Sequence, residues 1–217
     1  MRVNILTMSK VTTPIKGGRV NIQKKMKTGT PLIRTNISVF FILLFSSAII
    51  FIGNFAHAES NTFQASADSY VSEDSTENYG SSKSLHIRKK TGGNQYIFIK
   101  FDLSAIPAGS LISSATVYFY HYYNYGGGVT DAGIYELDDD SWVEEDITWG
   151  NKPDEGDLLD TIDCSAGGTN LWRAWDVTSF VNSEIENEDN VVSFCLRTEA
   201  LNGATTGSYM RSLLSQR

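Results

Sequence analysis

The chain contains, from Asp140 to Pro153, the stretch DSWVEEDITWGNKP, in which two tryptophans stand seven residues apart. Three consecutive acids lie between them, and a Gly-Asn-Lys-Pro turn follows. Apolar residues do not recur here at helical spacing, whereas threonine and tryptophan favour strands, and glycine, asparagine and proline end them. The stretch therefore predicts an ordered corner of an all-β domain.

The first 58 residues differ from the rest of the chain in charge. They hold eight Lys or Arg and no Asp or Glu, so the other 159 residues hold ten basic and all 25 acidic residues. The resulting net charge of about −15 over residues 59–217 argues against binding to nucleic acid or to anionic lipid surfaces.

The basic leader ends in an apolar run, residues 37–55, which is followed by Ala56-His57-Ala58. A basic segment, an apolar segment and small residues before a cleavage point are typical of a secretory signal peptide. We therefore expect residues 1–58 to be a signal peptide and the protein to be secreted or displayed on the cell surface. The alternative is an uncleaved anchor, because the apolar run approaches the ~20 residues that span a bilayer; only then would the domain contact a membrane. Residues 1–25 lack hydrophobic periodicity and are expected to be disordered or, with Met26 as the start, not translated.

Alternating or apolar runs, separated by Gly, Asn and Pro turns, recur along the rest of the chain, as in a sandwich or barrel. They predict eight strands, at residues 67–71, 84–88, 95–103, 113–123, 132–137, 158–162, 172–177 and 191–197. One short helix is expected around Phe180, with Asp176 or Thr178 as its N-cap. Residues 59–64 are expected to be a polar leader.

Two of these strands alternate between faces. In the 113–123 strand an aliphatic face is typical of core, and His121 continues it as a half-buried structural residue. The opposite face carries Tyr118, Tyr120 and Tyr122. Their hydroxyls need hydrogen-bond partners or water, so this face is not ordinary core.

Seven motifs follow one another in the order ADSYV (67–71), NYGS (78–81), YIFIKFDLS (96–104), IPAG (106–109), ISSATV (112–117), the Trp142-to-Pro153 block and WDVT (175–178). Together, over about residues 63–213, they resemble the DNRLRE-type domain, also called the disaggregatase-related repeat. The resemblance implies a carbohydrate-binding module with a jelly-roll-type β-sandwich fold, of a kind found in secreted and cell-surface proteins. We therefore expect one such domain over residues 63–217. The family's closing strand is not recognisable, so the sandwich is expected to lack its last strand and to leave an open edge.

Sugar modules stack the apolar face of a pyranose on aromatic rings and satisfy its hydroxyls with polar side chains. We therefore predict a polysaccharide-binding face that consists of Tyr118, Tyr120 and Tyr122, with Tyr96 and Lys100 if the two strands pair. Further candidates at strand ends are Tyr123, Tyr125 and Trp172. The alternative is that this face packs beneath a second layer. Trp142 and Trp149 are expected to anchor their loop to the core.

A calcium ion is the one cofactor that the sequence suggests. Glu144, Glu145 and Asp146 offer carboxylate oxygens, with Asp68 as a joint ligand and residues 138–140 as rivals. Jelly-roll sugar modules often carry structural calcium, so the resemblance points the same way; the alternative is a solvated acidic loop. The two cysteines, Cys164 and Cys195, are either a disulfide or two buried thiols.

The expected function is non-catalytic binding of polysaccharide or of a cell-surface matrix. A glycosidase needs two carboxylates fixed across a cleft, and in so acidic a chain such pairs can be chosen at will. Two alternatives remain: a structural or adhesive surface protein without a specific ligand, and a fragment of a polysaccharide-depolymerising enzyme of the disaggregatase type.

Overall fold

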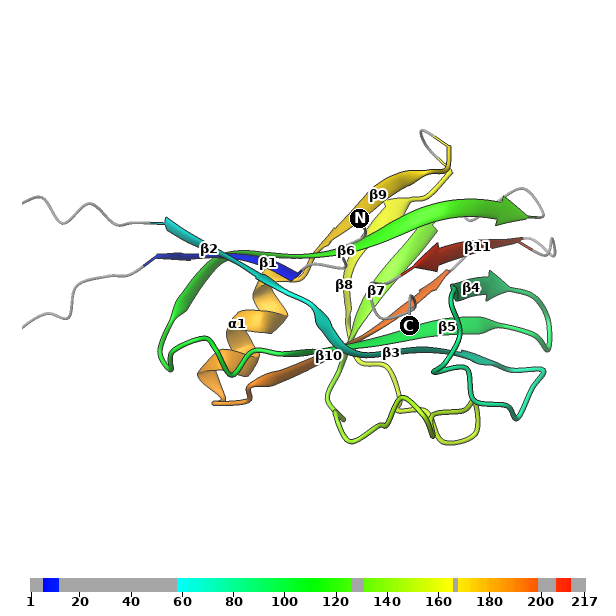
Figure 1. Cartoon of the computed structure of the whole chain (residues 1–217), viewed down its shortest axis with the longest axis horizontal. Helices are drawn as coiled ribbons and strands as arrows, with labels where there is room; N and C mark the ends of the chain where they lie inside the picture. The colour runs from blue at the N-terminus through cyan, green and yellow to red at the C-terminus, as the bar shows by residue number, and fades with distance from the viewer. Residues whose placement is uncertain (1–5, 12–57, 126–130, 166–167, 199–205, 212–217) are drawn as a thin grey trace, which may run out of the picture. The chain divides into compact units, whose positions relative to one another are not determined.

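Eleven antiparallel strands and one helix make up the part of the chain that the computed structural model describes, residues 6–11, 58–125, 131–165, 168–198 and 206–211 (Figure 1). The strands are β1 (Leu6–Val11), β2 (Ala58–Phe63), β3 (Ala65–Ser72), β4 (Leu85–Lys89), β5 (Gln95–Asp102), β6 (Leu111–Tyr125), β7 (Asp131–Leu137), β8 (Leu158–Asp163), β9 (Leu171–Asp176), β10 (Val191–Thr198) and β11 (Thr206–Arg211). The helix is α1 (Thr178–Glu186).

The strands form one hydrogen-bonded sheet that curls into two walls. The first wall has the order β9-β6-β11-β4, and the second wall has the order β3-β5-β10-β7-β8. The two walls join at a single pairing, Arg88 opposite Gln95. A ribbon of β1 and β2 extends the first wall along β6. The expected all-β domain is thus confirmed as a curled antiparallel sheet.

The main core lies between the two walls and includes fully buried aromatic residues from both. On the first wall, Phe119 meets Trp175 edge to face, with ring centroids 5.7 Å apart. Trp175 also donates its indole N–H to the Ala132 carbonyl oxygen on the second wall (2.8 Å). Burying one large apolar side chain contributes about 1.5–3 kcal/mol, so this pair ties the two walls together.

Helix α1 packs against the start of β6 and against β10. Phe180 contacts Phe194 on β10, and the Asn182 amide exchanges two hydrogen bonds with the Ile112 backbone on β6. The expected side-chain N-cap is wrong, because Val177 occupies the cap position. The Asp176 carboxylate instead accepts bonds from the Thr178 backbone N–H and hydroxyl.

The loop over residues 138–157 covers the outer face of the second wall. Trp142 is buried against Phe98 and donates its indole N–H to the Ser193 hydroxyl (3.1 Å). Trp149 lies 5.0 Å from the Tyr96 ring. The expectation that both tryptophans anchor this loop is therefore confirmed, and β5 is buried on both faces rather than on one.

All eight strands predicted from the sequence are present, and three more are added. Residues 59–63 belong to β2, so the expected polar leader is wrong. The expectation of disorder over residues 1–25 is wrong for Leu6–Val11, which form β1. The apolar run 37–55 and the signal-peptide prediction lie outside the described residues. No helix in the described ranges is long and apolar enough to cross a membrane.

Three further residues that carried sequence-based expectations are buried in the structure. Cys164 and Cys195 are free, buried thiols, so the disulfide is not formed. His121 is fully rather than half buried. Its Nε2 bonds Asn124 Oδ1 (2.7 Å), while its Nδ1 faces the Arg173 guanidinium (3.4 Å).

Candidate functional site

Three aromatic side chains form what we call the aromatic platform on the outer face of the first wall: Tyr118 and Tyr120 from β6 and Trp172 from β9. Alternation along β6 directs the tyrosines away from the buried Val117 and Phe119. Tyr120 and Trp172 are directly opposite in the ladder, and their rings meet edge to face at 5.4 Å. Trp172 is 39% exposed.

The residue on β9 opposite Tyr118 is small. Tyr118 lies opposite Ala174, whereas Tyr120 lies opposite Trp172. Ala174 is exposed, and Tyr118 and Tyr120 are partly exposed. The arrangement presents aromatic carbon on the outer face of β6 and β9.

A second aromatic group, which we call the aromatic ladder, crosses four strands. It runs from Tyr123 on β6 to Tyr209 on β11, His86 on β4, Tyr70 on β3 and Tyr79 in the following loop. Successive ring centroids are 5.4, 4.2, 4.3 and 4.3 Å apart. Tyr123 is 51% exposed whereas Tyr70 is buried, so only the β6 end of the ladder is open to a large ligand.

The inner part of the ladder is electrically neutral. Burial, helped by the charge of the nearby Arg88 guanidinium, lowers the pKa of His86 from 6.5 to about 4. Burial likewise raises the pKa of Tyr70 to about 12. Both rings are therefore uncharged near pH 7 and stabilise the ladder by stacking.

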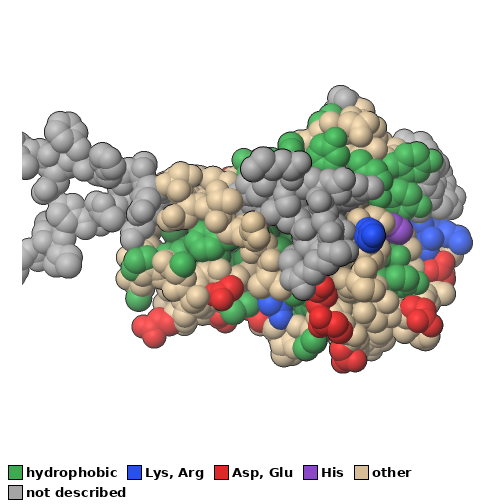
Figure 2. Space-filling model, in the orientation of Figure 1, with side chains coloured by type: hydrophobic (Ala, Val, Ile, Leu, Met, Phe, Trp, Pro, Cys, Tyr) green, Lys and Arg blue, Asp and Glu red, His purple; other side chains and the backbone are tan. Residues whose placement is uncertain are grey.

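Hydrophobic side chains gather over the C-terminal part of β6 on the face that Figure 2 shows. In the described part of the chain, two aromatic residues are strongly exposed, Tyr123 and Trp172, and both belong to the first wall. The third predicted tyrosine, Tyr122, is partly buried and lies 6.2 Å from the Tyr209 ring. Tyr125 ends β6, and its side chain lies outside the described part.

The structure does not bring Tyr96 and Lys100 to the platform, because β5 and β6 lie in different walls and do not pair. Tyr96 is buried beneath Trp149. The Lys100 ammonium donates to the carbonyl oxygens of Asp140 and Trp142 (2.6 and 2.7 Å) and lies 4.6 Å from the Trp142 ring centroid. Both residues therefore hold the 138–157 loop on the second wall.

The four predicted calcium ligands are only partly gathered. The Asp68 backbone N–H donates to Glu144 Oε2 (3.2 Å), so these two residues are neighbours. Glu145 and Asp146 are exposed. Among the described residues, no group of three or more His, Cys, Asp or Glu side chains is placed to hold a metal. Calcium prefers six to eight oxygens, so the four carboxylates do not form one ligand shell.

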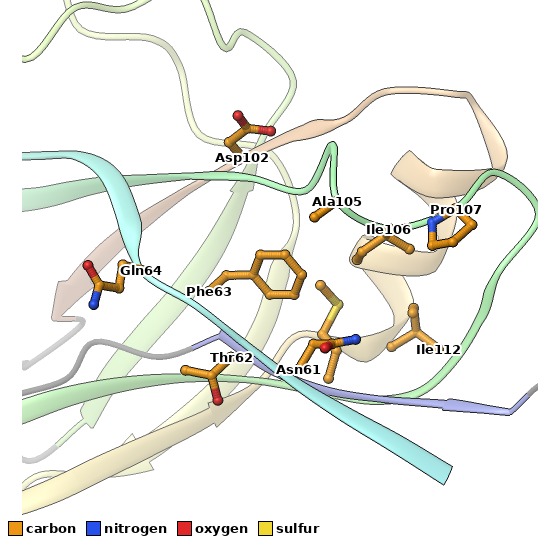
Figure 3. Close-up of a pocket in the computed structure, with 10 residues that line it drawn as sticks. Asn61, Thr62, Phe63, Gln64, Asp102, Ala105, Ile106, Pro107 and Ile112 are labelled. Carbon is orange, nitrogen blue, oxygen red and sulfur yellow. The ribbon is translucent and has the colours of Figure 1, made fainter. Parts of the chain in front are cut away.

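A cavity of about 530 Å³ lies between the β1–β2 ribbon and the connection from β5 to β6 (Figure 3). The Phe63 ring points into it, and Ile106 and Met8 add apolar lining. Asn61, a polar lining residue, is exposed. The platform residues do not line this cavity, and sequence patterns did not predict it because they did not predict β1 and β2.

Residues 59–211 match the family model of a carbohydrate-binding module. This stretch is more than two thirds of the chain, and the protein belongs to carbohydrate-binding module family 96. A gellan lyase from a Bacillus species is 25% identical over 103 residues. The match covers 46% of this chain but 4% of that protein, so the chain spans a small part of the length of this curated relative.

Proposed function

We propose that the protein binds polysaccharide without catalysing a reaction, and that the aromatic platform is its contact surface. The observation that carries the proposal is the exposed Trp172 ring beside Tyr120, on the outer face of the first wall. Membership in a carbohydrate-binding family supports it. A pyranose would lie with its C–H face on these rings, while its hydroxyls bond the phenols and water.

A retention assay tests the platform directly. Migration of the protein is measured in native gels that contain gellan or a neutral glycan. Trp172→Ala and Tyr120→Ala should each weaken retention about tenfold, the equivalent of 1.4 kcal/mol. Leu158→Ala removes an even more exposed apolar side chain, 50% exposed on β8, and should leave retention unchanged. If the two platform variants bind like the Leu158 variant, the platform is not the contact surface.

We further propose that the protein is exported and binds a polysaccharide or a cell-surface matrix, as the DNRLRE-type resemblance suggests. Residues 59–217 carry a charge of about −15. Repulsion between this acidic domain and an anionic polymer such as gellan is screened by salt. Affinity for gellan should therefore rise between 20 and 200 mM salt, while affinity for a neutral glycan should stay constant. A fall in gellan affinity with salt would argue for a basic contact instead.

The likeness to a gellan lyase favours a second candidate function, a module that serves a depolymerising enzyme. In that case the chain by itself releases no reducing ends from gellan, but it increases the activity of a lyase to which it is attached. A sugar-reducing-end assay on the isolated chain separates this candidate from a catalytic fragment. Release of ends that depends on protein concentration would contradict the non-catalytic proposal.

We retain calcium as a proposal for the 138–157 loop. If an ion binds, Glu144 is the ligand we expect, because it is the predicted ligand whose carboxylate contacts the backbone of Asp68, another predicted ligand. Calcium should then raise the melting temperature, and Glu144→Gln should remove the effect. Glu145→Gln, an exposed neighbour, serves as the matched control and should keep it. Equal melting temperatures with calcium and with chelator would end this proposal.

A further inference from the structure

Two strands from opposite ends of the sequence share one edge of β6. Thr116 and Val117 pair with β9 and also with β1, whereas Tyr120 and His121 pair with β9 and also with β11. A strand has two edges, and β9 occupies one edge of β6 from Thr116 to His121. β1 and β11 must therefore lie on the other edge, one after the other.

The registers place β1 as a continuation of β11. β11 runs from Gly207, opposite Tyr125, to Arg211, opposite Tyr120. β1 then runs from Leu6, opposite Val117, to Val11, opposite Leu111. Both strands are antiparallel to β6, so they point in the same direction. Figure 1 shows β1 beside the first part of β6 and β11 beside its last part.

The contacts of β1 are those of an integral strand. Met8 is 2% exposed and belongs to the main core, where it faces Ala115 across the ladder. The Ser113 hydroxyl donates to the Ser9 carbonyl oxygen (2.8 Å) beside a shift in the register. On its other side β1 pairs with β2 over six positions. Within the described residues, β1 is the sole sheet partner of β2.

We propose that the edge of β6 from Leu111 to Val117 is a strand-binding site, and that Leu6–Val11 of the same chain is its occupant. Recognition rests on backbone hydrogen bonds along the edge and on one apolar side chain, Met8, at the inward position. This edge of β6 is thus covered by a segment from near the start of the chain. The same segment completes the cavity, since Met8 and Ile112 both line it.

This pairing and the removal of residues 1–58 exclude each other in one molecule. Cleavage after Ala58 would take β1 away, would leave β2 without its sheet partner and would expose the β6 edge to water. An exposed edge presents unpaired backbone groups that recruit another extended segment. The β1 segment therefore decides whether this side of the domain is closed or able to bind a strand.

Disulfide trapping in the full-length chain tests the occupant. Thr7 and Thr116 are directly opposite and partly exposed, and cross-strand Cα distances suit a disulfide. Under mild oxidation the Thr7→Cys/Thr116→Cys protein should form an intramolecular disulfide at least fivefold more than the Thr7→Cys/Thr161→Cys control, whose second thiol lies on β8. The native cysteines are buried in both proteins.

Non-reducing electrophoresis and peptide mapping identify the disulfide-linked products of the oxidation. A cross-linked monomer supports the proposal. A disulfide-linked dimer would show that the strand comes from a second copy and would overturn the same-chain assignment. A yield equal to that of the Thr161 control would overturn the pairing itself.

A second measurement tests whether the edge accepts a strand. Met8→Asp in the full-length chain places a carboxylate at the buried position and should expel β1. A labelled peptide with the sequence of residues 3–12 should then bind this variant at least tenfold more tightly than it binds the wild type, whose edge is filled. The milder Met8→Ala variant should be intermediate. Equal, weak binding to all three proteins would refute a strand-binding site.

Discussion

Mild acid should destabilise the domain through His86. The imidazole lies between the Tyr70 and Tyr209 rings, with centroids 4.3 and 4.2 Å away. Burial, helped by the charge of Arg88, lowers its pKa from 6.5 to about 4. Between these two values the unfolded chain holds a proton on His86 that the folded domain does not accept. The folded state therefore loses stability as the pH falls through this range.

The pKa shift fixes the size of the effect. With a pKa of 6.5 in the unfolded chain and about 4 in the fold, linkage gives a loss of about 2 kcal/mol between pH 7 and pH 5. The effect should approach its full size near pH 4, where other groups also titrate. His86→Phe keeps a stacked ring but has no proton to bind, so it should remove this part of the pH dependence.

Urea unfolding at pH 7 and at pH 5 measures the loss in both proteins. The wild type should lose about 2 kcal/mol more than the His86→Phe variant over this interval. His121, whose pKa is also lowered by burial, is present in both proteins, and its contribution cancels in the comparison. If the two proteins lose equal stability, His86 does not titrate as its buried position requires, and the ladder is more open than the structure indicates.

Three further predictions concern the loop that covers the second wall. Gly80→Ala should cost about 3 kcal/mol in urea unfolding, because a Cβ there would lie 2.1 Å from the Glu144 carbonyl oxygen; Gly150→Ala, which has open space, is the matched control. Lys100→Met should lower the free energy of unfolding by about 2 kcal/mol, because two carbonyl oxygens of the loop lose their donor. Amide hydrogen exchange should become faster in the loop but not on β6. Trp142→Phe should lower the free energy of unfolding by about 1–2 kcal/mol, because the Ser193 hydroxyl on β10 loses the indole N–H donor. An unchanged urea midpoint would show that this buried hydrogen bond contributes nothing to stability.

Local alternation was enough to predict the elements of this fold but not their partners. Tyr118 and Phe119 were assigned to opposite faces of one strand, and burial confirms this. Tyr96 and Lys100 were tied to the same surface only on the condition that their strand pairs with the next. Consecutive strands usually are neighbours, but here the connection between β5 and β6 passes from one wall to the other. Strand pairing depends on contacts between residues that are far apart in the sequence. The alternation of residues within a single strand carries no information about those contacts.

The aromatic ladder and β1 were missed for a related reason. His86 and Tyr209 become neighbours only when β11 takes its register between β4 and β6. In Leu6–Val11 the apolar residues Leu6 and Met8 alternate with polar ones, but Lys10 and Val11 break the alternation, so the segment is too short to give a periodic signal. Such a strand is recognised by the edge that receives it rather than by its own sequence.

The outer faces of the two walls differ in how far their side chains are buried. β10 and β5 are buried on both faces, one by the core and one by the 138–157 loop. β9 alternates strictly, with Trp175 buried and Trp172 exposed. The loop that carries Trp142 therefore removes the aromatic residues of the second wall from solvent. Because a sugar ring needs an uncovered aromatic face, the exposed Trp172 ring supports the proposal that a polysaccharide would contact the first wall.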